Sequence, residues 1–189
     1  MPVTDHHTGE LLARAQKGNS EALGSLYDRY YTGVFHYLYY RVGDVHLAED
    51  LASEVFFRMV HRLSDFQPRA TSLQAWLFQV ARNMVIDHYR KNNNRVNVEL
   101  HEDVAALDGD PTQAAEQRLT HEQLTRALNG LMPDQRDVII LRFIIGMSLA
   151  QTGQILHKSE DAVKGLQRRG LLELRTHMRE WKVEDEKLG

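Results

Sequence analysis

The chain has 189 residues, of which 42% are hydrophobic and none is cysteine, and its formal net charge is −3. This length fits one medium domain or two small ones, and the apolar content excludes a wholly disordered chain. No apolar run reaches the roughly 20 residues of a membrane helix, and "MPVTDHHTGELLARAQKGN" lacks the segments of a secretory signal. Because disulfides and thiolate zinc sites need cysteine, both are excluded. We expect a cytoplasmic protein that does not insert into membranes.

The charge is distributed unevenly along the chain. Residues 67–95 hold five Lys or Arg against one Asp, and residues 164–182 hold six against two Glu. Between them, residues 96–123 hold seven acidic residues against one Arg. Attraction to phosphate depends on local rather than total charge, so the two basic stretches are compatible with a nucleic-acid partner.

Apolar residues recur at helical spacing almost throughout, whereas strand-like alternation and hairpin turn signals are nearly absent from the sequence. We therefore expect an all-α fold. Four helices are predicted in the first half: at residues 9–17, at 20–41, from an Asp44 cap along the apolar stripe Leu47, Leu51, Val55, Met59 and Leu63, and from a Thr71 or Ser72 cap onward.

A linker is predicted at residues 93–113, which are rich in Asn and acidic residues and contain Pro111. It divides the chain into two small helical domains. The predicted parts are an N-terminal extension at 1–18, a first domain at 19–92, the linker, a second domain at 114–182 and a tail at 183–189.

The second domain has the pattern of a helix-turn-helix. After a helix at about 112–131, Pro133 opens a helix that Gly146 ends, "SLAQ" at 148–151 is a capping box, and a short helix reaches Leu156. Ser159 then caps a long basic helix to about Trp181. The N-terminal end of such a helix can enter a major groove while its cations hold phosphates. The alternative is an ordinary helical hairpin with a solvated basic face.

The stretch "AWLFQVARNMVIDHYRKNNN" (75–94) joins an apolar half to a basic half. One face of the predicted helix carries Leu77, Val80, Ala81 and Met84, and another carries Gln79, Asn83, Asp87 and Arg90. Asn can pair with a base edge, Arg with phosphate, and an aromatic ring with an unpaired base, a stack worth about 1–3 kcal/mol. The alternative is that Trp76 anchors the core and the basic end is only solvated.

These stretches resemble the extracytoplasmic-function (ECF) subfamily of sigma-70 transcription initiation factors. "WLFQVARNMVIDHYRK" is similar to their promoter −10 recognition helix, and "EALGSLYDRYYTGVFHYLYYRVGDVHLAEDLASEVFFRMVHRL" to the core-binding helices before it. "LNGLMPDQRDVIILRFIIGMSLAQTGQILHKSEDAVKGLQRRGLLELR" resembles their −35-reading domain. Both domains match in the right order around a short linker.

The resemblance implies a factor that binds core RNA polymerase, directs it to promoters and helps to melt the −10 element. It implies contact with single-stranded −10 DNA by Arg69, Thr71, Ser72, Trp76, Arg82, Asn83, Asp87, Arg90 and Lys91, with Asn83 the best candidate for a base contact. It implies contact with the −35 duplex by Ser159, Glu160, Asp161, Lys164, Gly165, Arg168 and Arg169. Core polymerase would bind Asp44, Asp50, Leu51, Glu54 and Phe57, although the position of Leu51 equally suits the core. An anti-sigma factor is implied as a further partner, and no cofactor.

Three residues depart from the subfamily pattern in the predicted helix-turn-helix. Thr152 and Lys158 stand where many relatives have an apolar residue, and His157 stands where many have glycine. The turn is therefore atypical, and these three residues are expected to affect its packing. Glu160 and Asp161 suit a helix N-terminus but would repel phosphate.

Three other classes of function explain the sequence less well. An enzyme is disfavoured because the ten histidines are scattered and the known catalytic and phosphate-loop motifs are missing from the sequence. No metal site is expected. A helix-turn-helix regulator that binds duplex DNA alone would explain only the second half of the chain, and an adaptor that acts only through protein contacts would have no effect on DNA.

Overall fold

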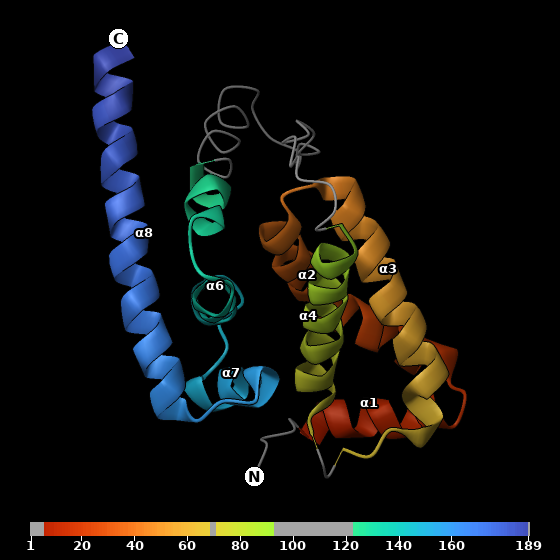
Figure 1. Cartoon of the computed structure of the whole chain (residues 1–189). Helices are drawn as coiled ribbons and strands as arrows, with labels where there is room; N and C mark the ends of the chain where they lie inside the picture. Colours follow the sequence, from red (N-terminus) through yellow and green to blue (C-terminus); the bar gives the residue numbers. More distant parts are fainter. Residues whose placement is uncertain (1–5, 69–70, 93–122, 189) are drawn as a thin grey trace.

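A computed structural model describes residues 6–68, 71–92 and 123–188 of the chain (Figure 1). These residues are helical, without a strand among them, which confirms the all-α prediction. The elements are α1 (His6–Gln16), α2 (Ser20–Val42), α3 (Val45–Arg62), η1 (Leu63–Asp65), α4 (Leu73–Asn92), a helical segment at 123–129, α6 (Pro133–Ile139), η2 (Ile140–Ile144), α7 (Leu149–Leu156) and α8 (Glu160–Leu188).

The helices of the first half begin and end at capping residues. The Asn19 side chain accepts a hydrogen bond from the Ala22 amide at 2.7 Å, and Asp44 accepts one from the Leu47 amide at 2.7 Å. Ser72, not Thr71, caps α4, with its Oγ 3.1 Å from the Ala75 amide. These bonds satisfy amides that have no partner within their own helix. Helices α2, α3 and α4 therefore begin within a residue or two of the predicted positions.

The first bundle buries one face of each helix. Val34, Tyr37 and Leu38 of α2 are fully buried, and the Tyr37 ring lies edge-on to Phe78 of α4 with centroids 5.7 Å apart. Leu77, Ala81 and Met84 of α4 are buried as predicted, whereas Val80 is half-buried. On α3 the predicted stripe is buried at Val55, Met59 and Leu63 but only half-buried at Leu47 and Leu51. The start of α3 therefore retains accessible apolar surface.

The second bundle contains the predicted helix-turn-helix. Pro133 is the first residue of α6, which continues as the π-helix η2 before Gly146 turns the chain at φ 79°. The capping box at the start of α7 is present, because Ser148 Oγ accepts from the Gln151 amide while the Gln151 side chain accepts from the Ser148 amide. Ser159 caps α8, which continues to Leu188 rather than ending near Trp181.

Each of the atypical turn residues has a defined place in the turn. Thr152 is fully buried, and its hydroxyl donates to the Ser148 carbonyl at 2.9 Å. His157 ends α7 in the left-handed conformation, with φ 54°, where a glycine would be at ease. Gly153 lies against the turn, because a Cβ there would be 2.7 Å from the Lys158 carbonyl oxygen. The turn thus depends on a hydroxyl, a left-handed histidine and one close backbone approach.

The two bundles pack on each other. Helix α7 lies against α4, and η2 lies against α2, while α8 packs on α6 and α7 (Figure 1). The predicted linker at 93–113 lies outside the described residues, as does the start of the helix predicted at 112–131. Contact between the bundles brings the −10-like helix next to the helix-turn-helix.

Candidate nucleic-acid interface

Helix α4 presents a polar face to solvent. Asn83, the predicted base contact, is exposed, while its neighbours Met84 and Val85 are buried and fix the rotation of the helix. Arg90 pairs with Asp87 one turn earlier at 3.1 Å, and Lys91 is exposed. The face therefore offers an amide that can read a base edge and two cations that can hold phosphate.

The loop before α4 contains the other predicted −10 contacts. Ser72 is occupied as the helix cap, and the Thr71 hydroxyl lies 3.5 Å from the Ser72 carbonyl. Trp76 is half-buried, with its ring edge-on to Phe66 at a centroid distance of 5.9 Å. The structure thus gives Trp76 the packing role of the alternative interpretation and leaves part of its ring accessible. Arg69 lies outside the described residues.

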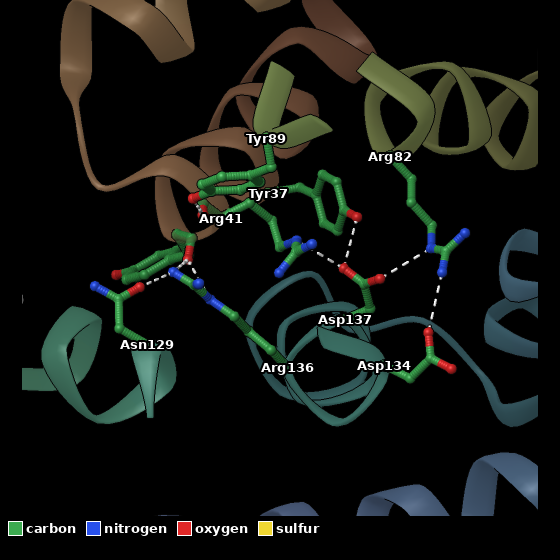
Figure 2. Close-up of polar contacts among 9 residues, drawn as sticks. Tyr37, Arg41, Arg82, Tyr89, Asn129, Asp134, Arg136 and Asp137 are labelled. Atoms are coloured by element: carbon green, nitrogen blue, oxygen red, sulfur yellow. Dashed lines mark hydrogen bonds and ion pairs between the residues drawn. The ribbon is translucent and has the colours of Figure 1, made fainter. Parts of the chain in front are cut away.

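Arg82 is engaged by the second bundle rather than free on the surface of α4. Its Nε donates to Asp137 Oδ2 at 2.9 Å, and its Nη2 donates to Asp134 Oδ1 at 3.0 Å (Figure 2). Partial burial disfavours the charge, but Asp137 and Asp134 outweigh that effect and raise the pKa of the guanidinium. The predicted phosphate ligand therefore already holds two carboxylates.

Asp137 is the centre of the contact between the bundles. The residue is fully buried and accepts a hydrogen bond from the Tyr37 hydroxyl at 2.8 Å. Arg41 Nε lies 2.9 Å from Asp137 Oδ1, an ion pair whose angles are not those of a hydrogen bond. Burial, and then the adjacent carboxylate, raise the pKa of Tyr37, so that its phenol stays protonated and donates. One carboxylate thus joins α2 and α4 to α6 (Figure 2).

Arg136 makes a second buried connection beside Asp137. Its Nε and Nη2 donate to the Tyr40 carbonyl at 3.1 and 2.8 Å, and Nη2 also donates to Asn129. Burial, together with the nearby positive charge of Arg41, lowers the pKa of Arg136 to about 10. The side chain therefore stays charged at neutral pH, but desolvation makes that charge costly.

Helix α7 covers the first turns of α4. The Gln79 amide donates to the Gln154 carbonyl at 2.9 Å, and the Gln151 amide donates to Gln74 at 3.2 Å. Lys158, at the turn after α7, pairs with Asp134 at 3.0 Å. The atypical Lys158 is therefore a member of the same charge network.

The predicted −35 residues lie at the start of α8. Ser159 is the cap, Lys164 pairs with Asp161 at 3.1 Å, and Gly165 is half-buried. The remaining predicted contacts are exposed: Glu160, Arg168 and Arg169. Arg142, from η2, donates to Gln167 at 3.1 Å and so ties α8 to the π-helix. The first two turns of α8 thus present mixed charge to solvent.

The predicted polymerase contacts lie on α3. Asp44 is its cap, Leu51 is half-buried, Asp50 is exposed, and Glu54 pairs with Arg58 at 2.7 Å. Phe57 is 57% exposed, which is unusual for a phenylalanine and suits a docking surface. Together they combine negative charge with an accessible ring.

Sequence reasoning missed the residues that join the bundles: Tyr37, Arg41, Asp134, Arg136 and Asp137. A signal was present, because two aspartates and an arginine precede the apolar run "VIILRFII" in a short helix. Taken alone, these three residues indicate only a polar N-terminus of a helix. Their burial depends on a second domain whose approach no local pattern encodes.

Within the described ranges, no cluster of three or more His, Asp or Glu has the arrangement of a metal site. In the same part of the chain, no helix combines the length and apolarity that crossing a bilayer requires.

A helix-turn-helix joined to a bundle with an exposed asparagine on a basic helix is an arrangement typical of DNA-binding transcription factors. Residues 26–95 match the family Sigma-70 region 2, and residues 127–176 match the family Sigma-70, region 4. The chain belongs to the sigma-70 family, in its ECF subfamily. We refer below to the two matched segments as region 2 and region 4.

Named relatives support this assignment. The ECF RNA polymerase sigma factor SigX of Bacillus subtilis is 35% identical over 88% of this chain and 90% of its own length. BldN of Streptomyces coelicolor is 38% identical over 86% of this chain, which covers 62% of the length of BldN.

Solved structures share the fold. CnrH, in complex with the cytosolic domain of CnrY, superposes with a TM-score of 0.71 at 25% identity, over 89% of this chain and 95% of that one. The sigma factor RpoE of Bartonella quintana, in complex with the anti-sigma factor NepR, gives 0.67 at 21% identity, over 82% and 96%.

Proposed function

We propose that this chain binds core RNA polymerase, directs it to specific promoters and helps to melt the −10 element. The observation that carries this proposal is the presence of both sigma regions in one chain, with Asn83 exposed on the basic helix of region 2. A regulator that binds duplex DNA alone needs only the helix-turn-helix of region 4. In this proposal residues 19–92 and 114–182 are the working domains and 93–113 joins them.

We assign the DNA contacts to the two basic helices, α4 and α8. Asn83 reads an unpaired −10 base, while Arg82, Arg90 and Lys91 hold the backbone. On α8, Lys164, Arg168 and Arg169 hold the −35 duplex. On α3, Asp50, Glu54 and Phe57 face polymerase.

Promoter melting then needs no covalent chemistry. Opening a duplex costs pairing and stacking, and a protein that binds unpaired bases but not paired ones shifts the equilibrium by its differential affinity. Residues that bind the strand only when it is unpaired therefore promote melting. Asn83 suits binding to an unpaired base, because it is exposed and its side-chain amide carries both a donor and an acceptor.

We further propose that an anti-sigma factor regulates this chain, and that the chain acts in the cytoplasm together with polymerase. Support comes from two solved relatives, one bound to the anti-sigma factor NepR and one to the cytosolic domain of CnrY.

Run-off transcription with bacterial core polymerase on a promoter library tests the proposal. Transcripts should require the chain, fall with Asn83→Ala, and persist with Thr32→Ala, a matched control at an exposed position on α2 outside the proposed contacts. Absence of polymerase binding and of transcripts, together with tight duplex binding by the chain alone, would establish the conventional regulator instead.

A further inference from the structure

We infer that Gln16 of α1 is a positioning residue for the reading of the −10 strand, because it fixes the start of the loop before α4 and, through Phe66, the ring of Trp76. This role rests on the proposed function, since it takes the accessible part of the Trp76 ring as the surface on which an unpaired base stacks. It also gives α1, which precedes the segment matched to Sigma-70 region 2, a part in that reading.

Helix α1 is anchored in the first bundle, although the family match begins only at residue 26. Leu11, Leu12 and Ala15 are buried. The helix packs on α2 and on η1, where the chain leaves α3 and enters the loop before α4 (Figure 1). The apolar face of α1 therefore holds its last turn, and Gln16 with it, beside η1.

The Gln16 side chain binds the end of η1. Its Nε2 donates to the Leu63 carbonyl at 3.0 Å and to the Phe66 carbonyl at 2.8 Å, which can use both amide hydrogens. The Phe66 backbone is extended, with ψ 124°, so the chain leaves the helical path there. Carbonyls at the end of a helical turn have no partner within that turn. Gln16 supplies the partner from 50 positions earlier in the chain, and it thereby fixes the point at which the loop departs.

Phe66 connects this anchor to Trp76. The two rings meet edge to face, with centroids 5.9 Å apart and an angle of 63° between their planes, and both residues are half-buried. Edge-to-face pairs are favoured by the charge distribution of the rings. Because the Phe66 carbonyl is bonded to Gln16, the backbone that carries the Phe66 ring is held in place. Gln16 thereby restricts the orientation in which Trp76 presents its accessible surface.

The other end of the loop is fixed by α4 itself. Ser72 caps the helix, with its Oγ 3.1 Å from the Ala75 amide. The proposed −10 contacts Thr71, Ser72 and Trp76 therefore lie close to two anchors, one supplied by α1 and one by α4. An aromatic ring that is already held in place loses less freedom when a base stacks on it, and this favours binding.

Fluorescence of Trp76 in the full chain tests the positioning. The chain has two tryptophans, so Trp181→Phe leaves Trp76 as the only one. On this background the unchanged chain is compared with Gln16→Met, which keeps a side chain of similar length but removes both donors. The controls are Lys17→Met at the exposed neighbouring position and Leu12→Ala in the buried face of the same helix. Quenching of Trp76 by acrylamide should rise in Gln16→Met and stay unchanged in Lys17→Met.

Strand binding by the complex with core polymerase tests the consequence for DNA. The −10 strand of a promoter recovered by run-off transcription is compared with strands in which each base in turn is replaced by an abasic site. The position that stacks on Trp76 is the one whose abasic penalty disappears in Trp76→Ala. At that position the unchanged complex should lose affinity about tenfold, and the Gln16→Met complex less than about threefold.

The core control separates positioning from general stability. Leu12→Ala should lower the melting temperature, because it leaves a cavity under α1, but it should keep the full abasic penalty. Gln16→Met should lose the penalty while its affinity for the abasic strand stays equal to that of the unchanged complex. If Gln16→Met loses its helical circular dichroism, the isosteric Gln16→Glu, which has no side-chain donor at neutral pH, decides instead.

Four results would overturn the inference: unchanged quenching in Gln16→Met, an undiminished abasic penalty in the same variant, no penalty that depends on Trp76, or an equal loss of the penalty in Leu12→Ala. Failure of the proposed function would look different, because the unchanged chain would then bind neither core polymerase nor the strand. That result removes the proposed function and this role of Gln16 together. Transcription that depends on the chain, with an undiminished penalty in Gln16→Met, removes only the role of Gln16.

Discussion

Replacing Tyr37 by phenylalanine isolates one bond of the contact between the two regions. The substitution removes a single oxygen from a fully buried ring and leaves its packing on Phe78 in place. The lost hydrogen bond, 2.8 Å long, joins the phenol to the carboxylate of Asp137. A hydrogen bond to a charged group contributes about 1.5–3 kcal/mol. Because the bond crosses between α2 and α6, we expect the contact between the two regions to lose that amount of stabilisation.

That loss corresponds to about a 10- to 150-fold fall in the equilibrium constant for packing of the two regions. Urea titration of the full chain measures the accompanying change in unfolding free energy. Tyr30→Phe, a buried tyrosine two turns earlier on the same helix, is the matched control. A Tyr37→Phe chain as stable as the unchanged chain, within about 0.5 kcal/mol, would refute the assignment of Asp137 as the centre of the contact.

Three further outcomes follow from single features. Partial burial raises the pKa of Asp134, but Lys158 and Arg82 outweigh this and lower it below its ordinary value, so its stabilisation of the contact between the regions should be complete near neutral pH and be lost as the pH falls through the lowered pKa, as urea titrations at decreasing pH would show. Gly153→Ala should lower the stability of region 4 by about 1–3 kcal/mol in thermal melts, because the added Cβ meets the Lys158 carbonyl at 2.7 Å; a melting temperature equal to that of the unchanged chain would contradict that contact. Ser148→Ala should cost about 1 kcal/mol through loss of the cap of α7, whereas Ser148→Asp should retain most of the stability in the same melts.

Local patterns in the sequence were sufficient for most helix boundaries. Asp44, Ser148 and Ser159 each cap the helix predicted for them, because capping depends on residues within one turn. The predicted end of α8, near Trp181, is too early, because the segment "VEDEKL" that follows is helical as well. Its Glu and Lys residues are good helix formers and continue the helix to Leu188.

The contact between the regions could not be predicted in the same way. The resemblance implies that Arg82 contacts DNA, and no local pattern in the sequence marks Asp137 as buried. They lie 55 positions apart, and their pairing depends on how two separately patterned bundles meet. Asn83, by contrast, lies on the polar helix face that periodicity predicts, and it is exposed. The helix face on which a residue lies depends on the local sequence. Its partners in another domain depend on how the two domains pack.

The burial of Asp137 constrains how the two regions can evolve. Its three partners, Tyr37, Arg41 and Arg82, all belong to region 2, so a change at any of them must be matched by a change in region 4. Exchange of whole regions between relatives would leave a buried carboxylate without its cations, or the cations without their carboxylate. We therefore expect the two regions to change together in evolution. A chimera that joins unmatched regions should lose the packing between them.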